Sequence, residues 1–85
     1  MTMYIPPKQR AEMGLSLIKE AILDHLSDHP SGLSNADFAR DLGLRAEQEG
    51  EQRDWLTYSL LGLLMIEGKI TKQGSRATAR YVRNA

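Results

Sequence analysis

Apolar residues recur at three- and four-residue intervals in the first third of the chain, a spacing that predicts an amphipathic helix. The helix extends from about residue 8 to residue 27 and follows Pro6 and Pro7. The segment Asp28-His29-Pro30-Ser31-Gly32 is rich in helix-breaking residues and is expected to end it. The apolar stripe of this first helix consists of Leu15, Ile18, Ile22 and Leu26.

A second, short helix is predicted by its capping residues. Ser34 can accept a hydrogen bond from the backbone at Asp37 while the Asp37 carboxylate reaches back, a variant of the capping box with Asp in place of Glu. We therefore expect this helix to begin near Asn35 and to end at Gly43, which suits a left-handed C-cap. Its apolar residues are Ala36, Phe38, Ala39 and Leu42.

A third helix is predicted from about residue 51 to residue 67, with Gly68 as its C-terminal stop. Trp55 either closes the core or anchors an interface, and we favour the core. Leu61 and Met65 fall off the main apolar stripe, and two exposed apolar side chains on one face indicate a partner surface. The residues expected to face the core are Leu56, Leu60, Leu63 and Leu64.

After the third helix the apolar period changes to two, which predicts a β-hairpin. Its strands are expected at residues 69–71 and 76–82, with a turn at residues 72–75. Tyr81 alternates with the exposed Arg80 and is therefore expected in the core.

The segment between the second and third helices, residues 45–50, is polar and without periodicity, which predicts a loop. Three helices followed by a hairpin indicate an α+β, mainly helical fold. We expect an extended N-terminal arm over residues 1–7 and a single domain over residues 8–85.

The chain has 85 residues, of which 41% are apolar and 26% charged, values typical of one small globular domain. So small a core is marginally stable alone, which favours a homodimer. Cysteine does not occur in the sequence, which excludes disulfides, thiolate zinc sites and cysteine nucleophiles and fits a cytoplasmic or nucleoid-associated protein. The longest apolar run, residues 60–66, is far shorter than the roughly 20 residues of a membrane span. We expect no signal peptide, because the first ten residues lack an apolar core.

Charge is segregated along the chain although the formal net charge is zero. Residues 69–85 contain five cations and no acid, and Lys8 and Arg10 bring the two ends to plus seven. All eleven acids lie in residues 11–68 beside four cations, a balance of minus seven. This division predicts one electropositive surface on an otherwise acidic body.

Three segments resemble elements of the winged helix-turn-helix superfamily. Residues 32–44 resemble its second helix, in which a small residue faces the helix crossing and Leu-Gly-Leu closes the element. Residues 56–70 resemble its third helix and exit, where leucines precede Glu-Gly and a strand, and residues 80–82 resemble the strand returning from the wing. The resemblance covers roughly residues 15–82. It implies a three-helix domain with a two-stranded C-terminal wing that binds duplex DNA sequence-specifically as a small transcriptional regulator.

The resemblance also implies how DNA would be contacted, with the third helix in the major groove and the wing on the backbone or in the minor groove. The helix face opposite the expected core carries Arg53, Thr57 and Tyr58, which would contact base edges or phosphates. Arg45 is a further candidate phosphate contact. The candidate residues of the wing are Lys69, Lys72, Gln73, Ser75, Arg76 and Arg80.

We expect double-stranded DNA and a second copy of the chain as partners. The N-terminal arm, with Met3, Tyr4 and Ile5, and the first helix are the expected dimer surfaces.

One departure from the family pattern is the link between the second and third helices. Residues 45–52 are longer than the usual few residues and contain three acids. The link either steers docking, excludes non-specific DNA or contacts a partner. The alternative function is a winged-helix protein-interaction module, which the neutral net charge, this acidic link and exposed Leu61 and Met65 would suit.

No catalytic activity and no cofactor are expected. His25 and His29 have the four-residue spacing of metal ligands, but Pro30 follows at once, and we interpret them as exposed histidines at a helix end. The sequence contains no Gly-rich phosphate loop after a strand and no histidine-supported serine nucleophile.

Overall fold

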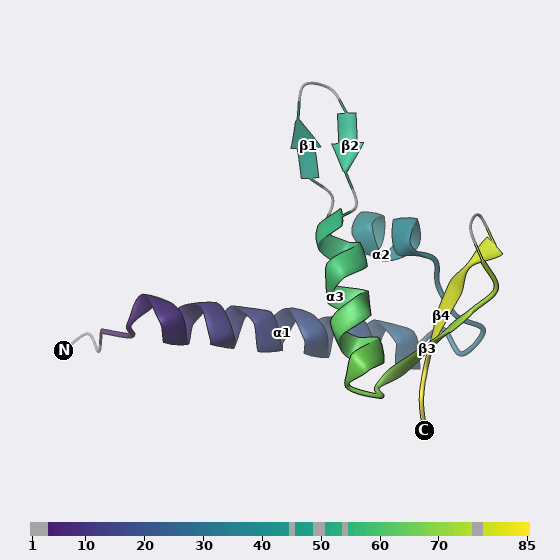
Figure 1. Ribbon diagram of the computed structural model, residues 1–85, viewed down its shortest axis with the longest axis horizontal. Helices are drawn as coiled ribbons and strands as arrows, with labels where there is room; N and C mark the ends of the chain where they lie inside the picture. Colours follow the sequence, from purple (N-terminus) through teal and green to yellow (C-terminus); the bar gives the residue numbers. More distant parts are fainter. Residues whose placement is uncertain (1–3, 45, 49–50, 54, 76–77) are drawn as a thin grey trace.

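The computed structural model describes residues 4–44, 46–48, 51–53, 55–75 and 78–85 (Figure 1). Within this part of the chain, helices and two antiparallel hairpins form an α+β fold, as the sequence predicts. The elements in chain order are α1 (Pro7–Ser27), α2 (Asn35–Asp41), β1 (Ala46–Gln48), β2 (Glu51–Arg53), α3 (Trp55–Ile66), β3 (Ile70–Gln73) and β4 (Arg80–Arg83).

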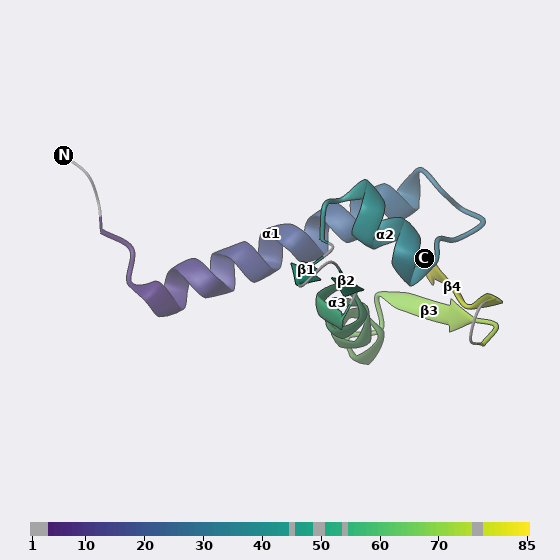
Figure 2. The same ribbon diagram turned by 90° about the horizontal axis from the view of Figure 1, so that it is seen from above.

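Helix α1 begins and ends where the apolar spacing and the prolines predict. Pro7 occupies its first turn, where the missing N–H leaves no helical hydrogen bond unmade. Ile22 and Leu26 are fully buried, but Leu15 on the same predicted stripe is exposed. The reason is visible in Figures 1 and 2: the N-terminal half of α1 extends away from the rest of the molecule, and only its C-terminal half packs on the core.

Helix α2 has the predicted capping box. The backbone N–H of Asp37 donates to Ser34 Oγ at 3.2 Å, and the backbone N–H of Ser34 donates to Asp37 Oδ2 at 3.0 Å. Two otherwise unpaired amides at the helix start are thereby satisfied. Phe38 and Ala39 face the core, and Gly43 has the left-handed backbone that the sequence predicts after the helix.

Strands β3 and β4 pair antiparallel, with Ile70 opposite Arg83 and Lys72 opposite Tyr81. The predicted turn at residues 72–75 is therefore misplaced, because Lys72 and Gln73 belong to β3 and the connection between the strands is residues 74–79. A single backbone bridge extends this pairing. Leu33, between α1 and α2, exchanges hydrogen bonds of 3.0 and 2.8 Å with Tyr81.

Gly32 is required next to this bridge. Its φ of 92° lies in the left-handed region, and a Cβ at this position would come within 2.9 Å of the Tyr81 carbonyl oxygen. A glycine therefore lets the loop after α1 approach β4 closely.

The core lies between the C-terminal half of α1, α2, α3 and the β3–β4 hairpin. Tyr81 is 3% exposed, which confirms the prediction that it is a core residue. Its ring meets Phe38 edge to face, with ring centroids 6.5 Å apart. The buried apolar residues are Ile22, Leu26, Leu33, Phe38, Ala39, Leu60, Leu61, Leu64, Ile70 and Tyr81.

The residues predicted to face the core from α3 were partly wrong, because the buried side of the helix is shifted by about one residue. Leu61 is fully buried, whereas Leu56 and Leu63, both expected in the core, are exposed. Trp55 is 60% exposed and is not a core residue. Because α3 carries apolar residues on every face, apolar spacing alone could not select the buried one. The residues that face the core are Thr57, Leu60, Leu61 and Leu64.

The predicted loop over residues 45–50 and the predicted start of the third helix near Glu51 were also wrong. Ala46–Gln48 and Glu51–Arg53 form the antiparallel strands β1 and β2, with Ala46 opposite Arg53. This small hairpin stands out from the N-terminal end of α3 (Figure 1). Among the described residues, no helix combines the length and apolar character of a membrane-crossing segment.

Side chains join the C-terminal ends of α1 and α2. His25 Nε2 lies 2.9 Å from Asp41 Oδ2, and Arg40 donates hydrogen bonds of 3.0 Å to Asp37 and Asp41. The hydrogen bonds from His25 and then from Arg40 lower the pKa of Asp41. The pKa of Asp37 is lowered chiefly by the backbone N–H of Ser34. Both carboxylates are therefore held in their charged form.

We expect Ser34→Ala to lower the free energy of unfolding by about 1 kcal/mol, because an amide in the first turn of α2 loses its acceptor. Urea denaturation followed by circular dichroism measures the effect. Ser31→Ala is the matched control, since Ser31 lies exposed in the preceding turn. Equal stability of the two variants would contradict a role of the capping box.

We expect stability to fall as the pH drops below the ordinary aspartate pKa of 3.8. The pKa values of Asp37 and Asp41 are depressed in the folded state, so their contribution is complete above 3.8 and is lost as the pH falls through the folded values. Urea midpoints measured from pH 7 to pH 2 test this. The double variant Asp37→Asn/Asp41→Asn should be less stable at pH 7 and lose less stability in acid; an unchanged acid profile would contradict the assignment.

Candidate nucleic-acid interface

Of the three residues predicted to contact DNA from the third helix, Tyr58 alone lies exposed on that helix. Arg53 belongs to β2 and precedes α3, so it does not lie on that helix. Thr57 is fully buried, and its hydroxyl donates to the Leu44 carbonyl oxygen at 3.4 Å, so it is unavailable to a groove or a phosphate. Tyr58 is 60% exposed.

Helix α3 also lacks the chemistry with which helices usually contact DNA. Trp55–Ile66 contains no Lys, Arg, Asp, Glu, Asn or Gln. The bidentate contacts that identify guanine and adenine come from Arg, Lys, Asn and Gln. The hydrogen-bonding groups that this helix exposes are the hydroxyls of Tyr58 and Ser59 and the indole N–H of Trp55.

The predicted wing residues, in contrast, lie at the surface. We call residues 69–85 the basic hairpin, because they contain five cations and no acid. It lies at the opposite end of the molecule from the N-terminal half of α1 (Figures 1 and 2). Two further candidates, Arg45 and Arg76, fall outside the described residues. The exposed candidates of the basic hairpin are Lys69, Lys72, Gln73, Ser75 and Arg80.

The strand register places cations on both faces of the basic hairpin. Residues directly opposite each other in an antiparallel pair project to the same face. Lys72 therefore shares the face of Tyr81, beyond the edge of the core, and Arg80 shares the opposite face with Gln73. Both strand faces thus carry positive charge near the tip.

The turn of the basic hairpin is fixed by backbone contacts. Gly74 has φ of 77°, and a Cβ there would come within 2.8 Å of the Thr78 carbonyl oxygen. The Thr78 hydroxyl and backbone N–H both donate to the Ser75 carbonyl oxygen, at 2.9 and 3.1 Å. The exposed Ser75 is thus held in a defined position beside Lys72 and Gln73 of β3.

Two of the cations, Arg80 and Arg83, also join the hairpin to α1 and to the loop that follows it. Arg80 donates to the Gly32 carbonyl oxygen at 3.0 Å. Arg83 donates to the Leu23 carbonyl oxygen at 3.2 Å and to the Ser27 hydroxyl. Arg83 was not among the predicted site residues, although its place at the end of the acid-free stretch could have identified it.

The other two described cations, Lys69 and Lys72, make no ion pair with any described acid. Asp37 borders a hollow of about 400 Å³ between α2 and the basic hairpin, lined also by Ser34 and Arg80. Its carboxylate disfavours an anion in that hollow. A polyanion would therefore meet the outer part of the hairpin, where Lys72 lies. Lys69, in contrast, lines a second hollow together with Glu20 and Glu67.

His25 lies in the last turn of α1, as predicted, but the two histidines are not the exposed residues that the sequence suggested. Both are half-buried: His25 contacts Asp41, and His29 Nδ1 lies 2.9 Å from the His25 carbonyl oxygen. No group of three or more metal-ligating side chains occurs in the described part of the chain.

Comparison of the chain with protein-family models, with curated proteins and with solved structures finds no match.

We expect Arg80→Gln to destabilise the fold by about 1 kcal/mol, because it removes a hydrogen bond that joins β4 to the loop after α1. Lys72→Gln removes the same charge from the same hairpin without a described structural partner, so its unfolding free energy should stay within about 0.5 kcal/mol of the wild type. Urea denaturation of both variants is the measurement. A larger loss of unfolding free energy in Lys72→Gln than in Arg80→Gln would contradict the assignment of a structural role to Arg80 and not to Lys72.

Proposed function

We propose that this protein binds duplex DNA through the basic hairpin and that its fold is a small winged helix. The observation that carries the proposal is the exposed, acid-free hairpin, with Lys72 and Arg80 on opposite faces. A polyanion such as DNA is attracted to a stretch of chain that carries several cations and no acid. The remainder of the chain carries all of the acids, so only one end of the molecule would face DNA.

The order of the elements supports the finer fold assignment. A helix is followed by an isolated bridge residue, Leu33, then by two helices and the C-terminal hairpin that pairs with that bridge. The sequence resemblance to winged helices implies three helices followed by a C-terminal hairpin; the β1–β2 hairpin between α2 and α3 is an addition to that order. Transcriptional regulation is the biological role that we propose for such DNA binding.

The proposed mode of contact differs from that expected from sequence. The third helix was expected to select bases, but α3 carries no charged side chain and its Thr57 is buried. Phosphate contacts fix position and affinity and carry little sequence information. We therefore propose that the basic hairpin supplies the affinity, with Tyr58 as the remaining candidate contact from α3.

A protein-interaction module without direct DNA binding is the second candidate. The specific observation in its favour is the large apolar surface that α3 exposes, including Trp55 and Ile66. Such surfaces mark contacts with other proteins more often than with nucleic acid.

The salt dependence of DNA binding tests the proposal. If four cations of the basic hairpin contact phosphates, the logarithm of the binding constant should fall with the logarithm of the salt concentration with a slope of about −3.6 per protomer. Fluorescence anisotropy with a labelled random duplex at several salt concentrations measures this slope. Lys72→Gln should make the slope shallower by about 0.9.

Lys8→Gln is the matched control, because it removes one positive charge from the projecting N-terminal half of α1, at the opposite end of the molecule from the basic hairpin. It should leave the slope unchanged. A slope near zero in the wild type, or no binding at about 50 mM salt, would reject DNA binding and make protein docking the better account.

A further inference from the structure

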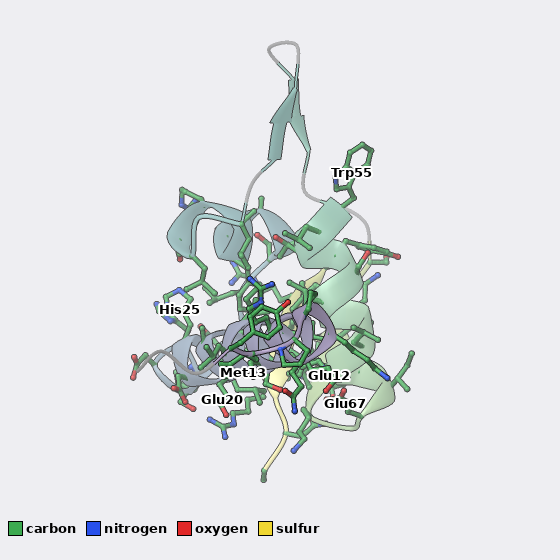
Figure 3. The ribbon with its side chains drawn as sticks, turned by 90° about the vertical axis from the view of Figure 1, so that its left-hand side faces the viewer. Glu12, Met13, Glu20, His25, Trp55 and Glu67 are labelled. Carbon is green, nitrogen blue, oxygen red and sulfur yellow. The ribbon has the colours of Figure 1, made fainter. Side chains whose placement is uncertain are left out.

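Helix α3 exposes more apolar surface than a helix in an isolated domain normally does. Ile66 is 85% exposed, and Trp55 and Tyr58 are each 60% exposed. A helix that is apolar on all sides is normally covered on all sides. Figure 3 shows Trp55 at the N-terminal end of α3, pointing away from the body of the molecule. Something outside the chain is therefore needed to cover this surface.

The residues of α3 are arranged symmetrically about the midpoint of the helix, between Leu60 and Leu61. Residues at equal distances from this midpoint are of the same kind: Trp55 and Ile66 are large and apolar, and Ser59 and Gly62 are small. On the flanks, Leu56 corresponds to Met65 and Tyr58 to Leu63. An antiparallel twofold contact between two copies of α3 brings each residue opposite its counterpart.

We propose that the outer face of α3, defined as Trp55, Ser59, Gly62 and Ile66, docks on the same face of a second copy of this chain, antiparallel about a twofold axis. These positions are spaced by four, three and four residues, which is the spacing of a seam between two packed helices. Trp55 of one copy lies opposite Ile66 of the other. This inference does not depend on the proposed DNA binding.

The centre of the outer face permits a close approach of the two helices. Ser59 and Gly62 are small, and a Cβ on Gly62 would meet no atom of its own chain within 4 Å. The packing within one chain therefore does not require glycine at this position. Between two copies, the missing side chain lets the backbones approach while the larger residues at the ends interlock.

The outer face and its flanks together expose six large apolar side chains. They are Trp55, Leu56, Tyr58, Leu63, Met65 and Ile66. A standard interface buries ~800 Å² per partner, so a stable dimer would have to cover the flanks as well as the outer face. Because Trp55–Ile66 contains no charged residue, the contact between the two helices themselves buries no charge.

The competing surface is the projecting half of α1, which the sequence favoured as the dimer contact. It has a shallow hollow of about 520 Å³, lined by residues that include Met13 and Leu17. Glu12 and Gln9 line the same hollow, and Figure 3 shows Glu12 beside Met13. A self-contact there would bring polar and acidic groups into the interface, unlike the uncharged face of α3.

Sedimentation equilibrium and tryptophan fluorescence of the full chain test the proposal. At ~50 µM the protein should sediment as a dimer, since interfaces of this size bind with micromolar or tighter affinity. Trp55 is the single tryptophan, so its emission should shift to longer wavelength as the dimer dissociates on dilution. A protein that sediments as a monomer at this concentration overturns the proposal.

Ile66→Glu should raise the dissociation constant at least about tenfold, because the dimer would contain two unpaired charges in an apolar contact. The fold should persist, since Ile66 is 85% exposed in one chain, and circular dichroism checks this. Leu17→Glu is the matched control on α1, where Leu17 is 64% exposed. Dissociation by Leu17→Glu with no effect of Ile66→Glu overturns the proposal in favour of the α1 surface.

Disulfide trapping tests the direction, because the chain has no cysteine of its own. In the antiparallel dimer the two copies of residue 66 are about 16 Å apart along the helix axis, beyond the ~7 Å limit for a disulfide. A mixture of Trp55→Cys and Ile66→Cys proteins should form the mixed disulfide under mild oxidation, and neither variant alone should cross-link. Efficient cross-linking of Ile66→Cys with itself overturns the antiparallel arrangement.

Discussion

The backbone pairing of Leu33 with Tyr81 joins the beginning and the end of the fold. It ties the loop after α1 to β4, and Gly32 permits the close approach that this pairing requires. Tyr81 is thereby turned inward against Phe38, and its ring closes the core. Because strand residues alternate, the same constraint turns Arg80 outward. The basic hairpin is therefore presented at the surface as a consequence of how the core is closed.

The core also determines what α3 can do. Because Thr57 and Leu61 lie on the buried side of α3, Trp55 and Ile66 lie on its exposed side. The helix thus offers an apolar surface without charge, and the basic hairpin offers charge with little apolar surface. We propose that these two surfaces have separate roles: the hairpin contacts the DNA backbone, and the outer face of α3 contacts a second copy.

The ends of α2 were predictable because the signals are local: the Ser34–Asp37 capping box and the left-handed Gly43 act within a few residues of the backbone that they fix. The buried face of α3 was not, because its apolar residues lie on all sides and only tertiary packing selects Leu61 over Leu56. The β1–β2 hairpin escaped prediction because its three-residue strands contain no alternating apolar residues. The prediction of Thr57 as a DNA contact failed for the same reason, because the buried face of α3 includes Thr57. The basic hairpin was predictable because it is defined by charge along the sequence, and its candidate residues that the structure describes are exposed.

The most direct test of separate surfaces is an NMR titration of isotope-labelled protein with a short duplex at a concentration where the oligomeric state is constant. The account predicts that the largest amide shift changes occur in the basic hairpin, residues 69–85, and that the outer face of α3 changes little. Largest changes along α3, with the basic hairpin unaffected, would contradict it, because DNA would then occupy the surface that we assign to the second copy.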